Sequence, residues 1–243
     1  MTRTVLALGG ADRVDFLQGL VTNDVARAAG GIVYTALLTP QGKFLSDFFV
    51  IGEDDRLLID VAADAAPALA QRLTMYRLRA DVTIDQTDIV VSRGVGGAPE
   101  GAFGDPRHVD LGWRHYGDSD LSDDTDWDAL RVALGVPATG IELSPETYIL
   151  EADFERLNGV DFKKGCFVGQ EIVARMKHKT VLKKGLARVS VTGAAKTGDA
   201  ITADGKPVGI LHTVSGDTAL AYLRFDRAQG KMQAGDAILK KIT

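Results

Sequence analysis

The chain has 243 residues, which at roughly 150 residues per domain predicts one large domain or two modest ones. Apolar residues make up 45% and charged residues 25%, so collagen, a coiled coil and wholesale disorder are excluded. The net charge of −5 argues against a chain coated in basic side chains for nucleic acid. Because no apolar stretch is long enough to span a bilayer and the N-terminus lacks a signal-peptide core, we expect a cytoplasmic protein without a membrane partner.

Alternating apolar residues and turn signals predict an α+β body over residues 1–180. Strands are expected at Thr4–Leu8, Ile32–Leu38, Lys43–Ile51, Arg56–Val61, Val82–Asp85 and Ile89–Ser92. Helices are expected from Asp12 to about Leu20, over Ala65–Arg79, from an N-cap at Asp126 through Leu134, and from near Gly169 to about His178.

Residues 185–243 show a different pattern, of short strands separated by hairpin signals. Asp204-Gly205 and Gly216-Asp217 are the turn sequences. The strands they separate are Gly185–Val191, Lys206–Val214 and Thr218–Phe225, and Ala237–Lys241 follows as a last strand. This pattern predicts a small β-barrel appended to the α+β body.

Charge is segregated along the chain. Residues 163–184 carry +6 and the remainder carries −11. Part of the negative charge lies in residues 117–128, where six aspartates occur without a basic residue. That run predicts a solvated loop or a flexible junction. The basic strip at residues 163–184 differs, because it surrounds Cys166, the single cysteine of the chain.

The segment 164–171, Lys-Gly-Cys-Phe-Val-Gly-Gln-Glu, has the most unusual composition in the chain. Its glycines permit a positive φ or the close approach of a ligand. Cys166 precedes a predicted helix and lies among cations, and both features favour a reactive thiolate. Glu171 and Arg175 have the i, i+4 spacing of a helical ion pair. On the residues alone, Cys166 is either a functional thiol or a small core residue beside a solvated basic face.

This segment resembles the signature of the YgfZ family of folate-binding proteins, which are related to the glycine-cleavage T-protein, an aminomethyltransferase. The matching positions are Lys164, Gly165, Cys166, Phe167, Gly169, Gln170, Glu171 and Arg175. Other segments are also similar to the family: Phe16–Gly19, Thr22–Val25, Gln41–Lys43, Ser46-Asp47, Tyr76–Arg79, the stretch from Trp127 to Pro137, and Gly209 with Ala221–Leu223.

The resemblance implies a two-lobed α+β folate-binding body with a C-terminal small β-barrel, and tetrahydrofolate or a derivative in a central opening. It implies an accessory protein that supports the assembly or repair of iron–sulfur proteins, including enzymes that modify tRNA, so iron–sulfur proteins or assembly factors are the expected partners. Cys166 is then a redox-active thiol or one ligand of a cluster shared with a partner. One cysteine cannot hold a cluster alone, so no intrinsic cluster is expected.

Several side chains suit the folate. Asp24 or Asp47 can accept from the pterin edge, and Trp127 or Tyr76 can stack on its face. Cations suit the carboxylates of the glutamate tail. The full set of expected folate contacts is Trp127, Asn23, Asp24, Tyr76, Arg77 and Arg79, with Lys164 as a further cation for the tail.

Two other functions remain open. A folate-dependent aminomethyltransferase needs a catalytic carboxylate, for which Asp47 is a weaker candidate, because T-proteins usually carry adjacent aspartates where this chain has Ser46-Asp47. Direct RNA binding by residues 163–184 is disfavoured by the lack of clustered aromatic residues. Whether the protein catalyses a reaction stays open, and a monomer is compatible with the sequence.

Overall fold

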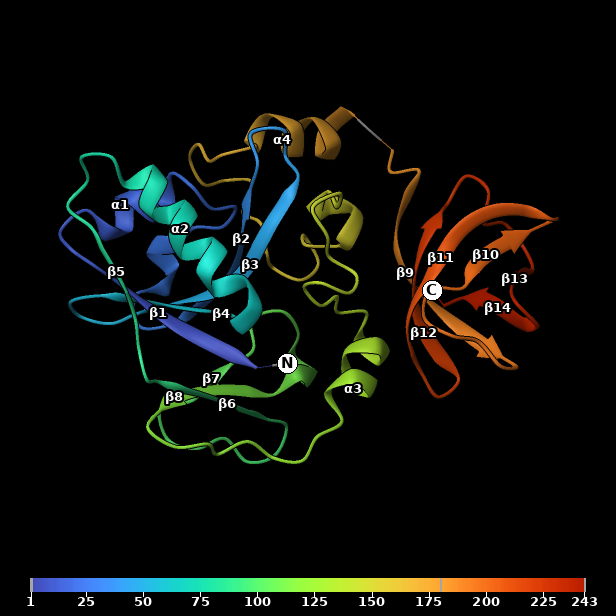
Figure 1. Cartoon of the computed structure of the whole chain (residues 1–243), viewed down its shortest axis with the longest axis horizontal. Coiled ribbons are helices and arrows are strands. Elements are labelled where there is room, and N and C mark those ends of the chain that lie inside the picture. Colours follow the sequence, from blue (N-terminus) through green and yellow to red (C-terminus); the bar gives the residue numbers. More distant parts are fainter. Residues whose placement is uncertain (1, 180, 243) are drawn as a thin grey trace. The chain divides into compact units, whose positions relative to one another are not determined.

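A computed structural model describes residues 2–179 and 181–242 (Figure 1). The chain divides into two compact units. The first consists of Met1–Thr125 and Glu155–Ile172, and the second of Asp126–Phe154 and Val173–Thr243. Residues 126–154 therefore group with the barrel, whereas the sequence placed them in the body. No helix in the described ranges is both long and apolar enough to cross a membrane.

The first unit contains two antiparallel sheets. The larger has the strand order β2-β3-β4-β1-β5 and the smaller the order β6-β8-β7. The strands of the larger sheet are β1 (Arg3–Gly9), β2 (Ile32–Leu38), β3 (Phe44–Gly52), β4 (Leu57–Ala62) and β5 (Thr83–Gln86). Those of the smaller sheet are β6 (Val90–Gly94), β7 (Phe103–Gly104) and β8 (Trp113–Gly117).

Helix α2 (Ala66–Arg77) packs on one face of the larger sheet. Pro67 lies in its first turn, where a missing N–H costs nothing. Leu69 and Leu73 belong to the same buried core as Phe48 of β3. The remaining helices assigned to this unit, in whole or in part, are α1 (Arg13–Gln18), the 3-10 helices η1 (Val25–Ala28), η2 (Ala63–Ala65) and η3 (Val109–Leu111), and the start of α4 (Gln170–Lys179).

The residues of β3 alternate between the two faces of the larger sheet, as a pleated strand requires. Phe48 and Val50 belong to the core beneath α2. Asp47 and Phe49 lie on the opposite face, where both contact Tyr34 of β2. This second face carries polar and charged groups that are described below.

The second unit consists of helical segments and a closed β-barrel. In α3 (Trp127–Leu134) the Asp126 carboxylate caps the helix by accepting from the Ala129 amide at 3.0 Å, and Gly135 ends the helix with φ 70°. The barrel has the strand order β10-β11-β12-β9-β14-β13. Its strands are β9 (Lys184–Thr192), β10 (Ala200–Ala203), β11 (Lys206–Ser215), β12 (Thr218–Arg224), β13 (Met232–Ala234) and β14 (Ala237–Lys241), and η4 (Ile149–Ala152) precedes them.

The observed architecture confirms the predicted α+β fold with a C-terminal β-barrel. The aspartate-rich run is more ordered than expected. Asp123 accepts from the Val95 amide at 2.7 Å, and its hydrogen bonds, that from Thr125 foremost, lower the pKa of Asp123 to about 2. The part of the run up to residue 125 is thus a solvated loop anchored to the smaller sheet, and the boundary between the two units lies within the run, between residues 125 and 126.

Candidate functional site

Cys166 lies on an exposed loop four residues before α4. The thiol is therefore accessible, and the alternative of a small core residue does not hold. The loop continues directly into α4, which starts one residue later than predicted and ends one residue beyond His178. Contacts made by residues on either side of Cys166 in the sequence hold this exposed loop in place.

Lys164 anchors the loop. Its side chain is buried, and Nζ donates to the Gln18 carbonyl at 2.6 Å and to the Val21 carbonyl at 2.5 Å. The ammonium also lies 5.2 Å from the ring centroid of Phe167, which is buried as well. Burial lowers the pKa of Lys164 to about 8, although the charges of Asp24, Asp161 and Cys166 act in the opposite direction.

Gly169 fixes the other end of the loop. It adopts φ +85°, and a Cβ at this position would lie 2.7 Å from the Thr39 carbonyl oxygen. A Cβ on Gly42, with φ +74°, would lie 2.8 Å from Cβ of Ile172. The turn between β2 and β3 therefore packs closely against the loop, and only glycine permits both the backbone conformation and the approach.

The other motif residues are more exposed. A Cβ on Gly165 would meet open space, and Gly165 is not among the glycines with positive φ, so the backbone conformation does not require a glycine at that position. Gln170 is half-buried at the start of α4, while Glu171 and Arg175 are exposed on it. The predicted basic strip is thus solvent-accessible around Cys166 over much of its length, with Lys164 as its buried member.

Asn23 and Asp24 lie near the anchor of the motif loop. Asn23 is buried, and its Nδ2 donates to the carbonyls of Tyr34 and Asn158 at 2.8 and 2.7 Å. Asp24 accepts from Gln18 Nε2 at 3.0 Å and caps η1. The structure gives Asn23 a positioning role, because both of its amide hydrogens are used within the protein.

The remaining predicted folate contacts are dispersed. Tyr76 packs partly buried against the core beneath α2. Arg77 and Arg79 are exposed at the end of that helix, and Arg77 Nη1 donates to the Val82 carbonyl at 3.3 Å. Trp127 is half-buried in the first turn of α3 and belongs to the second unit.

Asp47 lies on the other face of the larger sheet. It is buried and accepts from the Tyr34 hydroxyl at 2.8 Å. Burial and the Asp47 charge raise the pKa of Tyr34 well above its usual value, so the phenol stays a neutral donor. Because α2 covers the opposite face, Asp47 does not form one folate site with Tyr76 and Arg77 of α2 or with Arg79, which follows that helix.

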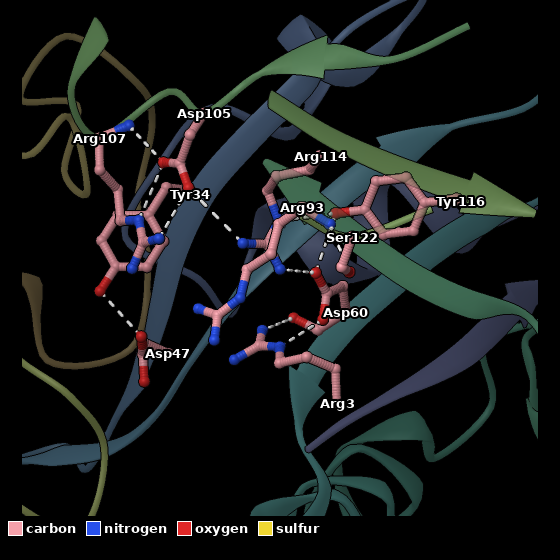
Figure 2. Close-up of polar contacts among 10 residues, drawn as sticks. All are labelled: Arg3, Tyr34, Asp47, Asp60, Arg93, Asp105, Arg107, Arg114, Tyr116 and Ser122. Atoms are coloured by element: carbon pink, nitrogen blue, oxygen red, sulfur yellow. Dashed lines mark hydrogen bonds and ion pairs between the residues drawn. The ribbon is translucent and has the colours of Figure 1, made fainter. Parts of the chain in front are cut away.

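A buried charge cluster surrounds Asp60 on the Asp47 face (Figure 2), and the sequence patterns did not predict it. Asp60 is fully buried, and its carboxylate accepts from Arg3 and Arg114, each at 2.6 Å. The Tyr116 hydroxyl donates to the same carboxylate at 2.9 Å. Burial alone would raise the pKa of Asp60, but the two arginines together lower it below its usual range.

The cluster continues through Asp105 to Arg107, which donates to that carboxylate at 2.7 Å. Arg114 and Arg107 also lie over the Phe49 ring, at 4.0 and 4.8 Å from its centroid. Arg93 lies beside these residues (Figure 2), and burial together with the neighbouring arginines lowers the pKa of Arg93 to about 10. The face is therefore polar, aromatic and rich in arginine.

This face fits part of the chemistry of a folate. It carries the kinds of groups that would suit the donor edge, the flat face and the carboxylates of that molecule, and in this structure those groups contact one another: Asp47 accepts from Tyr34, Asp60 pairs with arginines, and arginines lie over Phe49. Within residues 2–179 and 181–242, no group of three or more His, Cys, Asp or Glu side chains is placed to hold a metal ion.

Comparison with known proteins adds independent observations. Residues 183–242 match the family model described as the CAF17 C-terminal β-barrel domain. The chain is 29% identical to the iron–sulfur cluster assembly factor IBA57, mitochondrial, of Homo sapiens, over 95% of this chain and 78% of that protein. It is 29% identical to the IBA57 homologue of Neurospora crassa, over 75% of this chain and 51% of that protein.

The fold resembles that of a solved aminomethyltransferase. The structure matches the glycine cleavage system aminomethyltransferase T from Bartonella henselae with a TM-score of 0.78, covering 99% of this chain and 82% of that one. At 14% identity this likeness establishes the T-protein fold and nothing about activity.

The comparisons correct one prediction. The relatives are named as mitochondrial proteins, which points to the mitochondrion and overturns the expectation of a cytoplasmic protein. That expectation depended on the lack of a signal-peptide core, which does not distinguish between compartments inside the cell.

Proposed function

We propose that this protein is an accessory factor for iron–sulfur cluster assembly or repair and that Cys166 is its functional thiol. Similarity to the IBA57 assembly factors along most of the chain supports the role, and the motif's resemblance to the YgfZ family adds tRNA-modifying iron–sulfur enzymes to the expected clients. The observation that carries the proposal is an exposed thiol on a loop anchored at both ends.

The geometry suits a thiol that acts on a partner. Cys166 is solvent-accessible, while Lys164 on one side and Gly169 on the other attach its loop to the first unit. A single thiolate supplies one of the ligands that a cluster needs, so a partner would supply the others. The exposed cations of residues 163–184 would favour an acidic partner surface.

The first prediction concerns Cys166. In cells that lack their own protein with this motif, Cys166→Ala should lose most of the rescue of iron–sulfur enzyme activity, including thiomethylation of tRNA, because the side chain is exposed and its removal spares the fold. Activity of the client enzymes and abundance of the variant are measured together. Full rescue by Cys166→Ala at normal abundance would contradict the role of the thiol.

The second prediction concerns folate, which we place against the Asp47 face. Tetrahydrofolate should bind the wild-type protein, and Asp47→Asn should weaken binding about tenfold, because a charged acceptor for the pterin edge is lost. Arg77→Ala is the matched control and should bind normally, since Arg77 is exposed on the helix that covers the opposite face. Calorimetric titration measures both affinities.

Trp127 stays a proposed contact, tested by fluorescence in a Trp113→Phe background. Quenching by tetrahydrofolate supports the contact, and an unchanged spectrum contradicts it.

A glycine-cleavage assay addresses the aminomethyltransferase alternative: turnover that requires Asp47 but not Cys166 would establish that reaction instead.

A further inference from the structure

The C-terminal end of α2 places a large apolar side chain in solvent on a strained backbone. Leu78 follows the last helical residue with φ 46° and ψ −103°, and it is 89% exposed. The Ala80 amide donates to the Arg77 carbonyl at 2.8 Å, so Leu78 and Arg79 are the central residues of a β-turn. The Leu78 angles are those of the first central position of a type II′ turn, where glycine is the usual residue. The leucine is therefore strained and gains little from burial.

Contacts with the segment before α1 fix the chain directly after this turn. The Asp12 amide donates to the Asp81 carbonyl at 3.1 Å, and the Asp12 carboxylate accepts from the Asp81 amide at 2.8 Å. A Cβ on Gly10 would lie 2.1 Å from the Asp81 carbonyl oxygen, so only glycine permits this approach. Strain persists where the surrounding structure fixes it, and strained residues cluster at functional sites. The turn thus holds the Leu78 side chain in solvent at a fixed position.

The exposed side of α2 has the spacing of a helix that packs against another helix. Four exposed residues follow one another at intervals of three, four and three, which is the repeat of a coiled-coil seam. They are Ala68, Gln71, Met75 and Leu78. Met75 is 69% exposed. A different side of α2, with Leu69 and Leu73, packs on the sheet. The exposed seam is therefore a second packing surface of the helix.

Arginine flanks this exposed seam. Arg72 and Arg79 each directly follow a seam residue and lie seven residues apart, at the position that forms ion pairs across a coiled coil. Residues 65–80 contain three arginines, no lysine and no acidic residue. Methionine and arginine are enriched in protein interfaces, whereas lysine is depleted. Two copies of α2 would repel each other through these arginines, so charge complementarity indicates an acidic partner and not a second copy of this chain.

We propose that the exposed seam of α2 and the Leu78 turn form a docking surface for an acidic amphipathic helix of a partner protein. The apolar side of that helix packs on Met75 and Leu78, and its carboxylates pair with Arg72 and Arg79. With 12 residues, α2 is about 18 Å long, so the contact is small and the complex transient. The proposal does not depend on the iron–sulfur role or on folate.

Methionine-methyl NMR tests the proposal with the intact chain. The probe is a helical peptide of three heptads with leucine at the seam positions and glutamate at the flanking positions, and its counterpart carries lysine in place of glutamate. The acidic peptide should shift the Met75 signal and leave that of Met232, which is buried in the barrel, unchanged. The lysine peptide should bind at least about tenfold more weakly, because it meets arginines. An unmoved Met75 signal at about 1 mM acidic peptide, or equal binding of the two peptides, would overturn the proposal.

Variants separate docking from folding. Leu78→Gly should weaken the acidic peptide about tenfold, because a buried apolar contact is lost. Its urea-unfolding midpoint should not fall, since glycine suits the turn. Arg79→Gln should weaken the acidic peptide but not the lysine peptide. The matched control is Val109→Ala, at an exposed apolar residue of η3, which should leave the affinity unchanged. Unchanged affinity of Leu78→Gly together with a lower midpoint would make Leu78 a structural residue and overturn the proposal.

Other occupants of this surface give different results. Vesicles of phosphatidylcholine and phosphatidylserine that broaden the Met75 signal, when the acidic peptide does not shift it, would assign the surface to a membrane. Dimerisation in sedimentation experiments that Leu78→Gly abolishes would assign it to a second copy of the chain. Either result would overturn the proposal of an acidic partner helix.

Discussion

The burial of Asp60 inside an apolar strand is possible because of its arginine partners. A carboxylate without access to water is destabilising unless opposite charges and hydrogen bonds compensate it. Asp60 receives hydrogen bonds from Arg3, Arg114 and Tyr116, which together occupy both of its oxygen atoms. The Asp60 side chain therefore joins β1, β4 and β8.

We expect Asp60→Asn to lower the free energy of unfolding by about 3 kcal/mol, because the buried Arg114 and the half-buried Arg3 both lose the charge of their Asp60 partner. Urea unfolding monitored by circular dichroism measures the loss. The matched control is Glu53→Gln, which breaks the exposed 2.5 Å pair with Arg56 and should cost less than about 1 kcal/mol. Similar losses in the two variants would contradict this account.

Single residues were predictable from the sequence to different degrees. The proposal for Cys166 came from one local segment, because the motif, the glycines and the cations are neighbours in the chain. The Asp60 cluster did not, because its members come from segments more than 50 residues apart. A lone aspartate in the apolar run Leu57–Ala62 was the available signal, and its partners required the fold.

At the scale of elements, the contact between the β2–β3 turn and the motif loop is the main structural constraint on the candidate site. Gly42 and Gly169 both adopt positive φ, and each would place a Cβ within 3 Å of the opposing segment. Two segments that the family resemblance treats separately therefore form one packed unit. Substitutions in the turn should affect the loop that carries Cys166.

Gly169→Ala should lower the free energy of unfolding by about 2 kcal/mol, because it combines an unfavourable positive φ with a 2.7 Å approach to the Thr39 oxygen. Chemical denaturation measures this change. Gly165→Ala, four residues earlier in the same loop, should change stability by less than about 0.5 kcal/mol, since its Cβ meets open space. A larger effect at Gly165 would show that the loop has a different conformation.

The predicted elements agree with the structure wherever regular alternation or capping was present. Ile32–Leu38 and Ala237–Lys241 match β2 and β14 at both ends, and the Asp126 cap of α3 is confirmed. Strand β8 was not predicted from the sequence. Its residue Arg114 is buried beside Asp60, but an arginine in a sequence pattern indicates a surface position. The short strands β7, β10 and β13 gave too few residues for a periodic signal.

For the whole molecule, acid should unfold the first unit before the barrel. Asp60 and Asp105, whose pKa values are lowered, are buried in that unit. Their contribution to stability is complete above about pH 4 and is lost as the pH falls through the lowered pKa values. The reason is that these two carboxylates bind protons at a higher pH in the unfolded state than in the folded state.

The two tryptophans report on this order. Trp113 lies in the first unit and Trp127 in the second. In acid titrations, the fluorescence transition of Trp127→Phe, which retains Trp113, should occur at a higher pH than that of Trp113→Phe. Coincident transitions would mean that the two units unfold as one.

Closure of the barrel has a practical consequence for protein engineering. Since β10 pairs with both β11 and β13, the ring of six strands presents no open edge to other chains. The turn at Asp204 and Gly205 is exposed, and both residues adopt positive φ, as a tight two-residue hairpin turn requires. A fluorophore or an affinity peptide inserted at this turn would leave the closed ring intact and remain remote in sequence from Cys166.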